Sequence, residues 1–274
     1  MSDIAISVDG VPVVAPAGST LLEACRQEGF DVPTLCFLEN LTPANTCRIC
    51  VVEVEGSRAL VPACSRQIEP GMVVHTESER VRHTRKMVLE LLGSSVDLSL
   101  LPLSGLMERY GARPDRSEGG ATVEEPATID NQLFVRDYAK CILCYKCVQA
   151  CGVDAQNTFA ISVAGRGFEA RISTEYQVSL PDSACVFCGN CFAVCPTGAL
   201  IPTTEYEMRE TGTWDEDSQS VTRTICPFCG VGCNLDLVVQ DNRILKALSP
   251  LDHDVTSGHL CIKGRFGWQH VQSE

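Results

Sequence analysis

The sequence predicts an α+β protein built from several small domains. Its 274 residues exceed the roughly 100 to 200 residues that are typical of one domain. The chain contains both strand-like and helix-like stretches, and segments rich in Gly, Pro, Glu and Ser divide it into blocks. Most of the 17 cysteines fall in tight groups, and this spacing is typical of metal ligands rather than of a disulfide framework.

Charge and hydropathy exclude two classes of partner. The chain has 22 Lys and Arg residues against 35 Asp and Glu residues, so its formal net charge is −13. Nucleic-acid binding depends on clustered basic residues, and we therefore expect no nucleic-acid partner. No apolar run approaches the roughly 18 residues of a membrane span, and Met1-Ser2-Asp3-Ile4 does not begin a signal peptide. We expect no membrane span and a location in the reducing cytoplasm.

Residues 1–78 have the pattern of a small mixed domain. Asp9-Gly10 lies between two strand-like stretches, which is a strong hairpin signal. Thr20 and Glu23 form a capping box for a helix, and Gly29 is placed to end it. This order of strands and helix is typical of a β-grasp domain. The expected strands are 4–8, 11–14, 49–55, 59–63 and 72–76, and the expected helix is 21–28.

The rest of the chain divides into five segments. Apolar residues recur at helical spacing after residue 79. Basic residues lie among them and predict a solvated face or, alternatively, a surface that binds an acidic partner. They are Arg80, Arg82, Arg85 and Lys86. Two stretches are polar and contain little to bury. The segments are a helical segment at 79–112, a linker at 113–130, a cysteine-rich βαβ-type domain at 131–208, an acidic linker at 209–220 and a small β-rich domain at 221–274.

The strongest signal is a run of four cysteines that occurs twice, at an offset of 44 residues. Each run has the spacing Cys-x2-Cys-x2-Cys-x3-Cys, the bacterial ferredoxin pattern for 4Fe–4S clusters, in which the fourth cysteine ligates the other cluster. Structural zinc is the alternative, but zinc has no use for three close thiolates and a fourth, twice over. The two predicted ligand sets are Cys141, Cys144, Cys147 and Cys195, and Cys151, Cys185, Cys188 and Cys191.

A different set, Cys36, Cys47, Cys50 and Cys64, belongs to the predicted β-grasp domain. Its first gap is longer than that of plant-type 2Fe–2S ferredoxins. Residues 1–78 resemble the N-terminal 2Fe–2S domain shared by the large iron–sulfur subunit of respiratory complex I, iron-only hydrogenases and NAD-linked formate dehydrogenases. The resemblance implies a 2Fe–2S cluster on these four cysteines, with zinc as the alternative.

In those relatives the next segment often carries a cluster held by one His and three Cys. The corresponding positions of this chain are Ser94, Leu98, Leu101 and Met107. None of these side chains ligates iron in the usual way. We therefore expect an apolar core without a metal in this segment.

The last set is Cys226, Cys229, Cys233 and Cys261. Together with the stretch that runs from Cys261 through Lys263, it resembles the N-terminal iron–sulfur segment of molybdopterin oxidoreductases, most closely of formate dehydrogenases. The resemblance implies a third 4Fe–4S cluster on these cysteines and places Lys263 between that cluster and a pterin, where electrons pass. A zinc ribbon is the alternative. Cys25 is left over and is expected to be a small buried side chain.

One 2Fe–2S and three 4Fe–4S clusters predict an electron relay. The sequence contains no Gly-rich nucleotide motif, Ser-His-Asp arrangement or open metal site, so we expect no active site of its own. The resemblance implies the iron–sulfur subunit of a cytoplasmic formate dehydrogenase. Its partners would be a separate catalytic subunit with a molybdenum or tungsten bis-pterin, since the pterin domain of single-chain relatives is missing, and a flavin subunit that reduces NAD.

Two other functions remain open. The chain could be the equivalent subunit of another NAD(P)-linked oxidoreductase, such as a nitrate reductase, a hydrogenase or a complex I relative, or a freestanding polyferredoxin. Residues 221–274 are few for a core of their own. We expect them to dock on the catalytic subunit by burying Phe228, Val231, Phe266 and Trp268.

Overall fold

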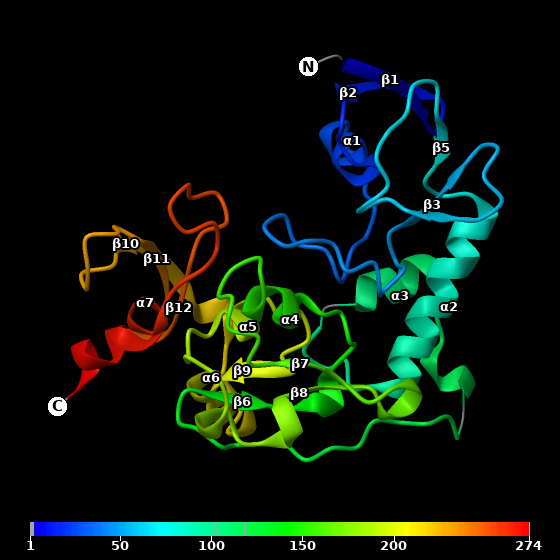
Figure 1. The fold of residues 1–274 in the computed structure, drawn as a ribbon. Coiled ribbons are helices and arrows are strands. Elements are labelled where there is room, and N and C mark those ends of the chain that lie inside the picture. Colours follow the sequence, from blue (N-terminus) through cyan, green and yellow to red (C-terminus); the bar gives the residue numbers. More distant parts are fainter. Residues whose placement is uncertain (1–2, 102, 118, 274) are drawn as a thin grey trace. The chain divides into compact units, whose positions relative to one another are not determined.

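A computed structural model describes residues 3–101, 103–117 and 119–273 (Figure 1). The chain forms two compact units. Unit 1 comprises residues 1–37, 43–122 and 142–144, and unit 2 comprises residues 38–42, 123–141 and 145–274.

Unit 1 contains a mixed five-stranded sheet in the order β2-β1-β5-β3-β4, in which β1 and β5 are parallel. The β1–β2 hairpin turns through Asp9 and Gly10, whose φ angles of 49° and 85° suit the predicted two-residue turn. The predicted strands are therefore present, although those after the helix are shorter. Their bounds are β1 Asp3–Val8, β2 Val11–Pro16, β3 Val51–Val54, β4 Val61–Pro62 and β5 Val73–His75.

Helix α1 (Leu21–Gln27) covers this sheet with its apolar side (Figure 1). The predicted capping box is present, because Thr20 accepts from the Glu23 N–H while the Glu23 carboxylate accepts from the Thr20 N–H. Cys25 is fully buried in the core between helix and sheet, as predicted, and burial raises the pKa of its thiol to about 11.

Helices α2 (Glu79–Ser95) and α3 (Ser104–Tyr110) occupy the predicted helical segment. The basic residues of α2 do not form one solvated face. Arg85 is fully buried, and its guanidinium donates to the backbone oxygens of Ile49 and Val51 and to Glu77. The prediction of a solvated face is wrong for Arg85, because the backbone of the neighbouring cysteine loop and the carboxylate of Glu77 replace water around it.

Part of the predicted linker packs on α2. The short 3₁₀ helix Pro114–Ser117 contacts α2, and a Cβ added to Gly93 would lie only 2.6 Å from Pro114 Cγ. Buried Glu90 also accepts a hydrogen bond from the backbone N–H of Arg113. Residues 119–130 form no helix or strand.

The first part of unit 2 contains the second four-cysteine run and, except for Cys144, which belongs to unit 1, the first run as well. Strand β6 (Phe134–Arg136) precedes both runs and β9 (Leu200–Pro202) follows them, and the two pair in antiparallel fashion. The strands at the two ends of the internal repeat are thus neighbours in one small sheet. Helices α4 (Lys146–Cys151) and α5 (Asn190–Ala193) pack on each other, and β7 (Ser162–Ala164) pairs with β8 (Arg171–Ser173).

Helix α6 (Thr203–Glu210) follows β9 and includes the beginning of the acidic stretch. Glu205 is buried there and forms ion pairs with Arg209 and with Lys246 of β12. Because α6 ends at Glu210 and Arg209 pairs with both Glu205 and Glu216, ordered structure extends beyond the predicted boundary at residue 208.

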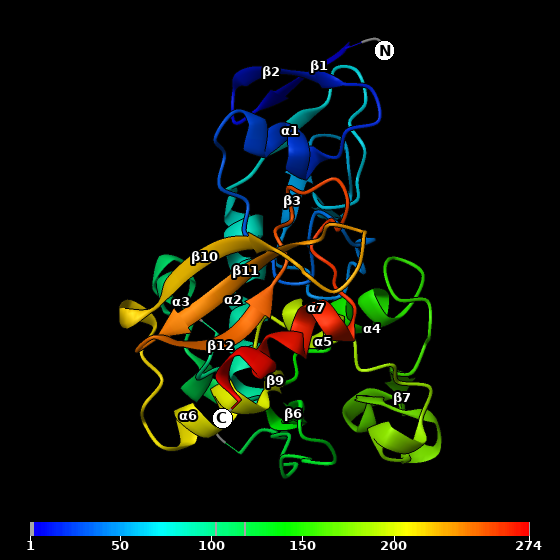
Figure 2. The same ribbon diagram turned by 90° about the vertical axis from the view of Figure 1, so that its left-hand side faces the viewer.

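The C-terminal part of unit 2 is a three-stranded antiparallel sheet of β10 (Ser220–Ile225), β11 (Asn234–Gln240) and β12 (Arg243–Leu248), followed by α7 (Ile262–Phe266) (Figure 2). Asp241 and Asn242 join β11 and β12 in a tight turn, and both residues have positive φ. Strand β10 has no counterpart in the prediction. The remaining 3₁₀ helices are Tyr138–Lys140, Gly167–Glu169, Glu175–Gln177, Leu180–Asp182, Glu216–Ser218 and Gly267–Gln272.

Among the described residues, no helix combines the length and the apolar character that crossing a bilayer requires.

Candidate iron–sulfur cluster sites

None of the 17 cysteines forms a disulfide. Thiolates are the ligands of iron–sulfur clusters, so the sulfurs of a predicted set must lie close together to hold one cluster. Within the described residues, no three or more His, Cys, Asp or Glu side chains form a group that could hold a metal ion. The cluster assignments therefore depend on which sulfurs are neighbours and on the backbone around them.

The set in unit 1 consists of two interacting thiol pairs. The sulfurs of Cys50 and Cys64 are 3.4 Å apart, and a hydrogen bond links Cys36 to Cys47. Hydrogen bonding by Cys47 lowers the pKa of Cys36 to about 5, and hydrogen bonding by Cys64 lowers the pKa of Cys50 to about 7. Hydrogen bonding by Cys50 and burial raise the pKa of Cys64, and negative charge on Cys50, Cys36 and Cys47 raises it further, so all four side chains share one electrostatic environment.

Helix α2 supports this cysteine loop through Arg85. The two carbonyls that Arg85 binds, those of Ile49 and Val51, lie on either side of Cys50 in the sequence. A second support is Asn45, whose amide oxygen accepts from the sulfur of Cys64 at 3.2 Å and from Ser65 at 2.8 Å. Sequence reasoning identified neither Arg85 nor Asn45 as a support of this site.

The two four-cysteine runs share an unusual backbone. Leu143 and Tyr145 have positive φ, and so do Phe187 and Gly189 at the equivalent positions of the second run. Backbones that alternate with left-handed residues turn successive N–H groups to one side and form anion-binding concavities, as in many iron–sulfur sites. In the second run the N–H of Phe187 donates to the sulfur of Cys185 at 3.4 Å. The two runs therefore share their backbone conformation as well as their cysteine spacing.

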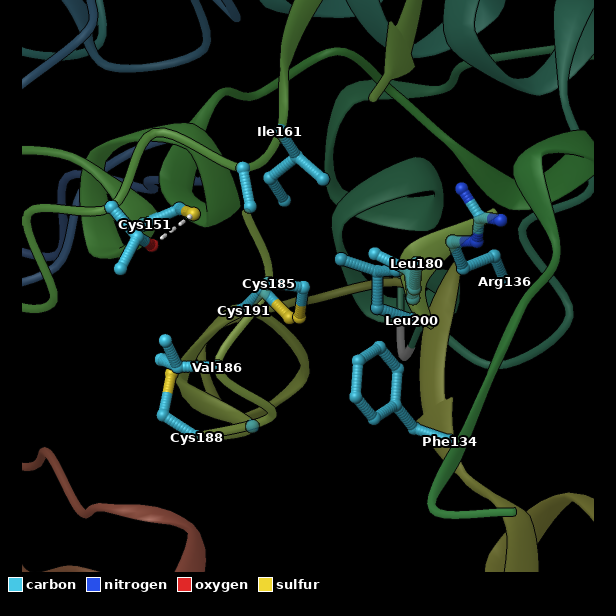
Figure 3. Close-up of a pocket in the computed structure, with 13 residues that line it drawn as sticks. Phe134, Arg136, Cys151, Ile161, Leu180, Cys185, Val186, Cys188, Cys191 and Leu200 are labelled. Atoms are coloured by element: carbon cyan, nitrogen blue, oxygen red, sulfur yellow. Dashed lines mark hydrogen bonds between the residues drawn. The ribbon is translucent and has the colours of Figure 1, made fainter. Parts of the chain in front are cut away.

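The second predicted set lines one cavity, which Figure 3 shows from within. Cys151 comes from the first run, and Cys185, Cys188 and Cys191 come from the second. The space between these side chains, including the open mouth of the cavity, is about 420 Å³. Apolar side chains form most of the remaining wall, among them Phe134, Ile161, Leu180, Val186 and Leu200.

Electrostatics agree with this grouping. Burial raises the pKa values of Cys185, Cys188 and Cys191, and negative charge on Cys151 raises all three further. Because burial and the nearby negative charge raise the pKa values of these three thiols, positive iron bound among them would favour their thiolate forms. These residues fit a cluster, and the crossing of Cys151 to the second run agrees with the ferredoxin pattern. The ligand assignment itself stays a prediction.

Two contacts describe the surroundings of the partner set, which consists of Cys141, Cys144, Cys147 and Cys195. Cys147 lies close enough to Tyr138 for its charge to act on the phenol, whose pKa burial raises. Cys195 contacts Thr197 with a sulfur–oxygen distance of 3.8 Å. The crossing of Cys195 to the first run therefore also stays a prediction.

The third predicted 4Fe–4S set is gathered at the edge of the C-terminal sheet. The Cys226 N–H donates to the Cys233 carbonyl at 2.8 Å. Burial raises the pKa of Cys233, and negative charge on Cys226, Cys229 and Cys261 raises it further. Cys229 and Cys261 are exposed, and so is Lys263 on α7. This cysteine set therefore lies at the surface of its unit, with a basic side chain two residues from one of its members.

The apolar residues around this set divide into two groups. Phe228 and Val231 are exposed, as a docking surface requires, with 39% and 58% of their surface accessible. Phe266 and Trp268 are buried within the chain, because Phe266 packs edge-on against Phe192 and the Trp268 indole donates to the Arg265 carbonyl. The prediction that Phe266 and Trp268 face a partner is wrong.

The four positions that the resemblance equates with one His and three Cys ligands hold side chains of a different kind. Leu98, Leu101 and Met107 pack against an apolar cluster that includes Leu89 and Leu103. Ser94 instead donates to the backbone oxygen of Leu91. The segment has the apolar core that the sequence predicts, and the lack of a cluster there stays a prediction.

Three family models match successive parts of the chain. Residues 2–79 match the 2Fe-2S iron-sulfur cluster binding domain, residues 137–199 match the 4Fe-4S dicluster domain, and residues 219–273 match the molybdopterin oxidoreductase Fe4S4 domain. The chain therefore carries three iron–sulfur domains of the kinds that the sequence predicts.

Curated relatives include oxidoreductases of several types. The NADPH-Fe(3+) oxidoreductase subunit alpha of Geobacter sulfurreducens is 33% identical over 98% of this chain and 32% of its own length. The NADP-reducing hydrogenase subunit HndD of Solidesulfovibrio fructosivorans is 40% identical over 73% of this chain and 36% of its own. A Staphylococcus haemolyticus protein named "Putative formate dehydrogenase" is 26% identical over 98% and 31%. The chain thus spans about a third of the curated relatives that it matches.

A solved structure shares the fold. A chain in the crystal structure of an NAD+-reducing [NiFe]-hydrogenase in the H2-reduced state superposes with a TM-score of 0.64 at 24% identity. The match covers 74% of this chain and 88% of that one.

Proposed function

We propose that this chain is the electron relay of a cytoplasmic formate dehydrogenase complex. It would carry electrons between a catalytic module with a molybdenum or tungsten bis-pterin and a flavin module that reduces NAD. The single observation that carries this proposal is the C-terminal cysteine set on a segment that matches molybdopterin oxidoreductases, in which Cys229, Cys261 and Lys263, nearby in the sequence, are exposed.

Four cysteine sets would hold the relay. One 2Fe–2S and three 4Fe–4S clusters supply sites that each accept and release one electron. The chain contributes thiolate ligands, left-handed backbone turns that aim N–H groups at sulfur, and apolar walls that exclude water. We retain the ligand sets of the sequence prediction, with Cys151 and Cys195 exchanged between the two four-cysteine runs. The reducing cytoplasm is the compartment that free thiols favour.

The exposed face around α7 is the docking surface that we propose for the pterin module. Lys263 carries a compact positive charge, and Phe228, Val231 and Ile262 add accessible apolar surface on the same segment. In this proposal Lys263 binds the pterin from the cluster side and offsets negative charge there. The apolar residues exclude water from the contact.

A hydrogenase relay is the second candidate, and one observation favours it. The NADP-reducing hydrogenase subunit has the higher identity, 40%, but its match covers 73% of this chain. The formate dehydrogenase relative matches 98% of the chain at 26% identity. We prefer the formate dehydrogenase role because the molybdopterin-type segment at 219–273 must also be explained.

Purification of the intact complex from the native host tests the proposal. The chain should purify with a molybdenum- or tungsten-containing protein and a flavoprotein, and the preparation should reduce NAD with formate. Nickel instead of molybdenum or tungsten, together with hydrogen-dependent reduction, would establish the second candidate. A chain that purifies alone with its clusters intact would contradict both and indicate a freestanding carrier.

A further inference from the structure

Arg265 is a buried cation whose guanidinium has no carboxylate to pair with among the described residues. It is 1% exposed, although it belongs to the short helix α7. Its Nη1 donates to the Ala247 carbonyl at 2.8 Å and its Nη2 to the Asn190 amide oxygen at 3.1 Å, while Nε is buried without a hydrogen-bond partner. In the part of the chain that the structure describes, no acidic side chain forms an ion pair with it.

Arg265 follows Cys261 in the sequence, but its side chain contacts the second four-cysteine run. Asn190 lies between Cys188 and Cys191 in the sequence, and the Arg265 guanidinium also stacks over the ring of Phe192 at 5.4 Å. Burial lowers the pKa of Arg265 to about 10, and negative charge on Cys188 and Cys191 acts in the opposite direction. The C-terminal segment thus inserts a positive charge beside the cavity of the second four-cysteine run.

The loop between Cys188 and Cys191 is shaped to receive this side chain. A Cβ added to Gly189 would lie 2.9 Å from Arg265 Cγ and 2.5 Å from the ring of Phe192. The Asn190 amide oxygen also accepts from the Leu260 N–H, which ties the same loop to the segment before α7. The equivalent positions of the first run are Tyr145 and Lys146, so that run has a bulky side chain and a basic residue of its own.

The other arginine at this cavity has a different role. Arg136 lines the cavity wall but forms an ion pair with Asp130, which offsets its charge. Arg265 lacks such an offset among the described side chains, and a buried cation without a counter-ion is costly unless an anion lies nearby. A cluster with four thiolate ligands is such an anion, and it becomes more negative when it is reduced.

We propose that Arg265 is a positioning and electrostatic residue for the cluster of Cys151, Cys185, Cys188 and Cys191, and that its charge raises the reduction potential of this cluster. The proposal rests on the proposed ligand set. Its physical basis is that a fixed positive charge in a dry site stabilises the reduced, more negative state over the oxidised state. The C-terminal segment would then set the potential of a cluster that it does not ligate.

Redox titration of the reconstituted full chain, followed by electron paramagnetic resonance, tests this proposal. In Arg265→Gln the equilibrium constant for reduction of this cluster should fall tenfold or more. For a one-electron couple, a tenfold fall lowers the midpoint potential by about 59 mV. Arg265→Lys keeps the charge but not both hydrogen bonds, so its potential should stay near that of wild type while its thermal stability falls. Asn190→Asp keeps the acceptor oxygen and adds a counter-charge to Arg265, so it should lower the potential in a chain that still folds.

The control is Arg223→Gln, which removes the same charge from an exposed site where Arg223 pairs with Asp236. It should leave the potential unchanged. Unshifted potentials in both Arg265→Gln and Asn190→Asp, with full iron content, would overturn the role of Arg265. A wild-type chain without a cluster on this cysteine set would overturn the ligand assignment as well, and the iron content separates the two results.

Discussion

At the residue scale, two fully buried arginines support cysteine loops in different ways. Arg85 holds the loop around Cys50 and has a carboxylate partner in Glu77 at 2.8 Å. Arg265 contacts the loop between Cys188 and Cys191 with an amide and a carbonyl as its partners. The first arrangement neutralises the arginine inside the protein, whereas the second leaves its charge to act on whatever the cysteines bind. Arg85 therefore has mainly a structural role.

Replacement of Arg85 by Met should reduce the free energy of unfolding by about 3 kcal/mol, because it leaves a carboxylate and two carbonyls without their buried donor. Chemical denaturation of the full chain, followed by circular dichroism, measures this loss. Arg80→Gln is the control, since Arg80 is exposed and its pair with Glu53 is at the surface, and it should cost much less. Equal losses in the two variants would contradict a structural role that is special to Arg85.

Replacement of Cys151 by Ser should remove the cluster of Cys185, Cys188 and Cys191 and leave that of Cys141 largely intact. The reason is that Cys151 lies in the cavity of the second run, although it belongs to the first. Iron analysis and electron paramagnetic resonance of the reconstituted variant measure the result, and Cys25→Ala, which changes a buried core thiol, should keep every cluster. Loss of the Cys141 cluster instead would show that the proposed crossing is wrong.

At the scale of elements, the features predicted best are those that depend on neighbours in the sequence. The Asp9-Gly10 hairpin and the Thr20–Glu23 capping box need only local geometry, and both are present. The burial of Arg85, Glu205 and Phe266 depends on partners far away in the sequence, such as Val51, Lys246 and Phe192, and the sequence pattern does not reveal such contacts. Short polar stretches are therefore assigned too readily to solvated faces and linkers.

Helix α2 and the 3₁₀ turn that follows α3 form one packed contact, and a glycine permits it. Gly93→Ala should destabilise the protein by about 1 to 3 kcal/mol, because the added Cβ would lie 2.6 Å from the Pro114 ring. Gly105→Ala in α3 is the matched control, since its Cβ would meet nothing within 4 Å and helix propensity favours Ala. Thermal denaturation should lower the midpoint for the first variant and not for the second. A gain of stability in both variants would show that the Pro114 contact is loose.

At the scale of the whole molecule, three iron–sulfur domains follow one another along the chain. The sequence predicts all three because cysteine spacing is a local signal that can be read from a single sequence. It does not predict which side chains of one domain support the cysteines of another, as Arg265 of the C-terminal segment contacts Asn190. Such support depends on how the domains of unit 2 pack.

Lys263→Met tests whether electrons leave through the C-terminal cysteine set. The side chain is exposed and is not a ligand, so all four clusters should assemble and the complex should remain intact. Loss of the positive charge should slow electron flow from substrate to NAD roughly 100-fold, as the removal of one preorganised charge often does. Artificial acceptors that draw electrons directly from the catalytic module should be affected much less. Equal loss in both assays would indicate structural damage, and no loss would make Lys263 a bystander.

The central claim is that the chain carries one 2Fe–2S and three 4Fe–4S clusters in series. Quantitative iron and zinc analysis of the reconstituted full chain, combined with Mössbauer spectroscopy, tests it most directly. The account predicts about 14 iron atoms per chain, two in the 2Fe–2S cluster and four in each 4Fe–4S cluster, with no stoichiometric zinc. About 18 iron atoms would show a fifth cluster in the segment of Leu98 and Leu101, and one zinc per chain would contradict the cluster assigned to Cys226, Cys229, Cys233 and Cys261.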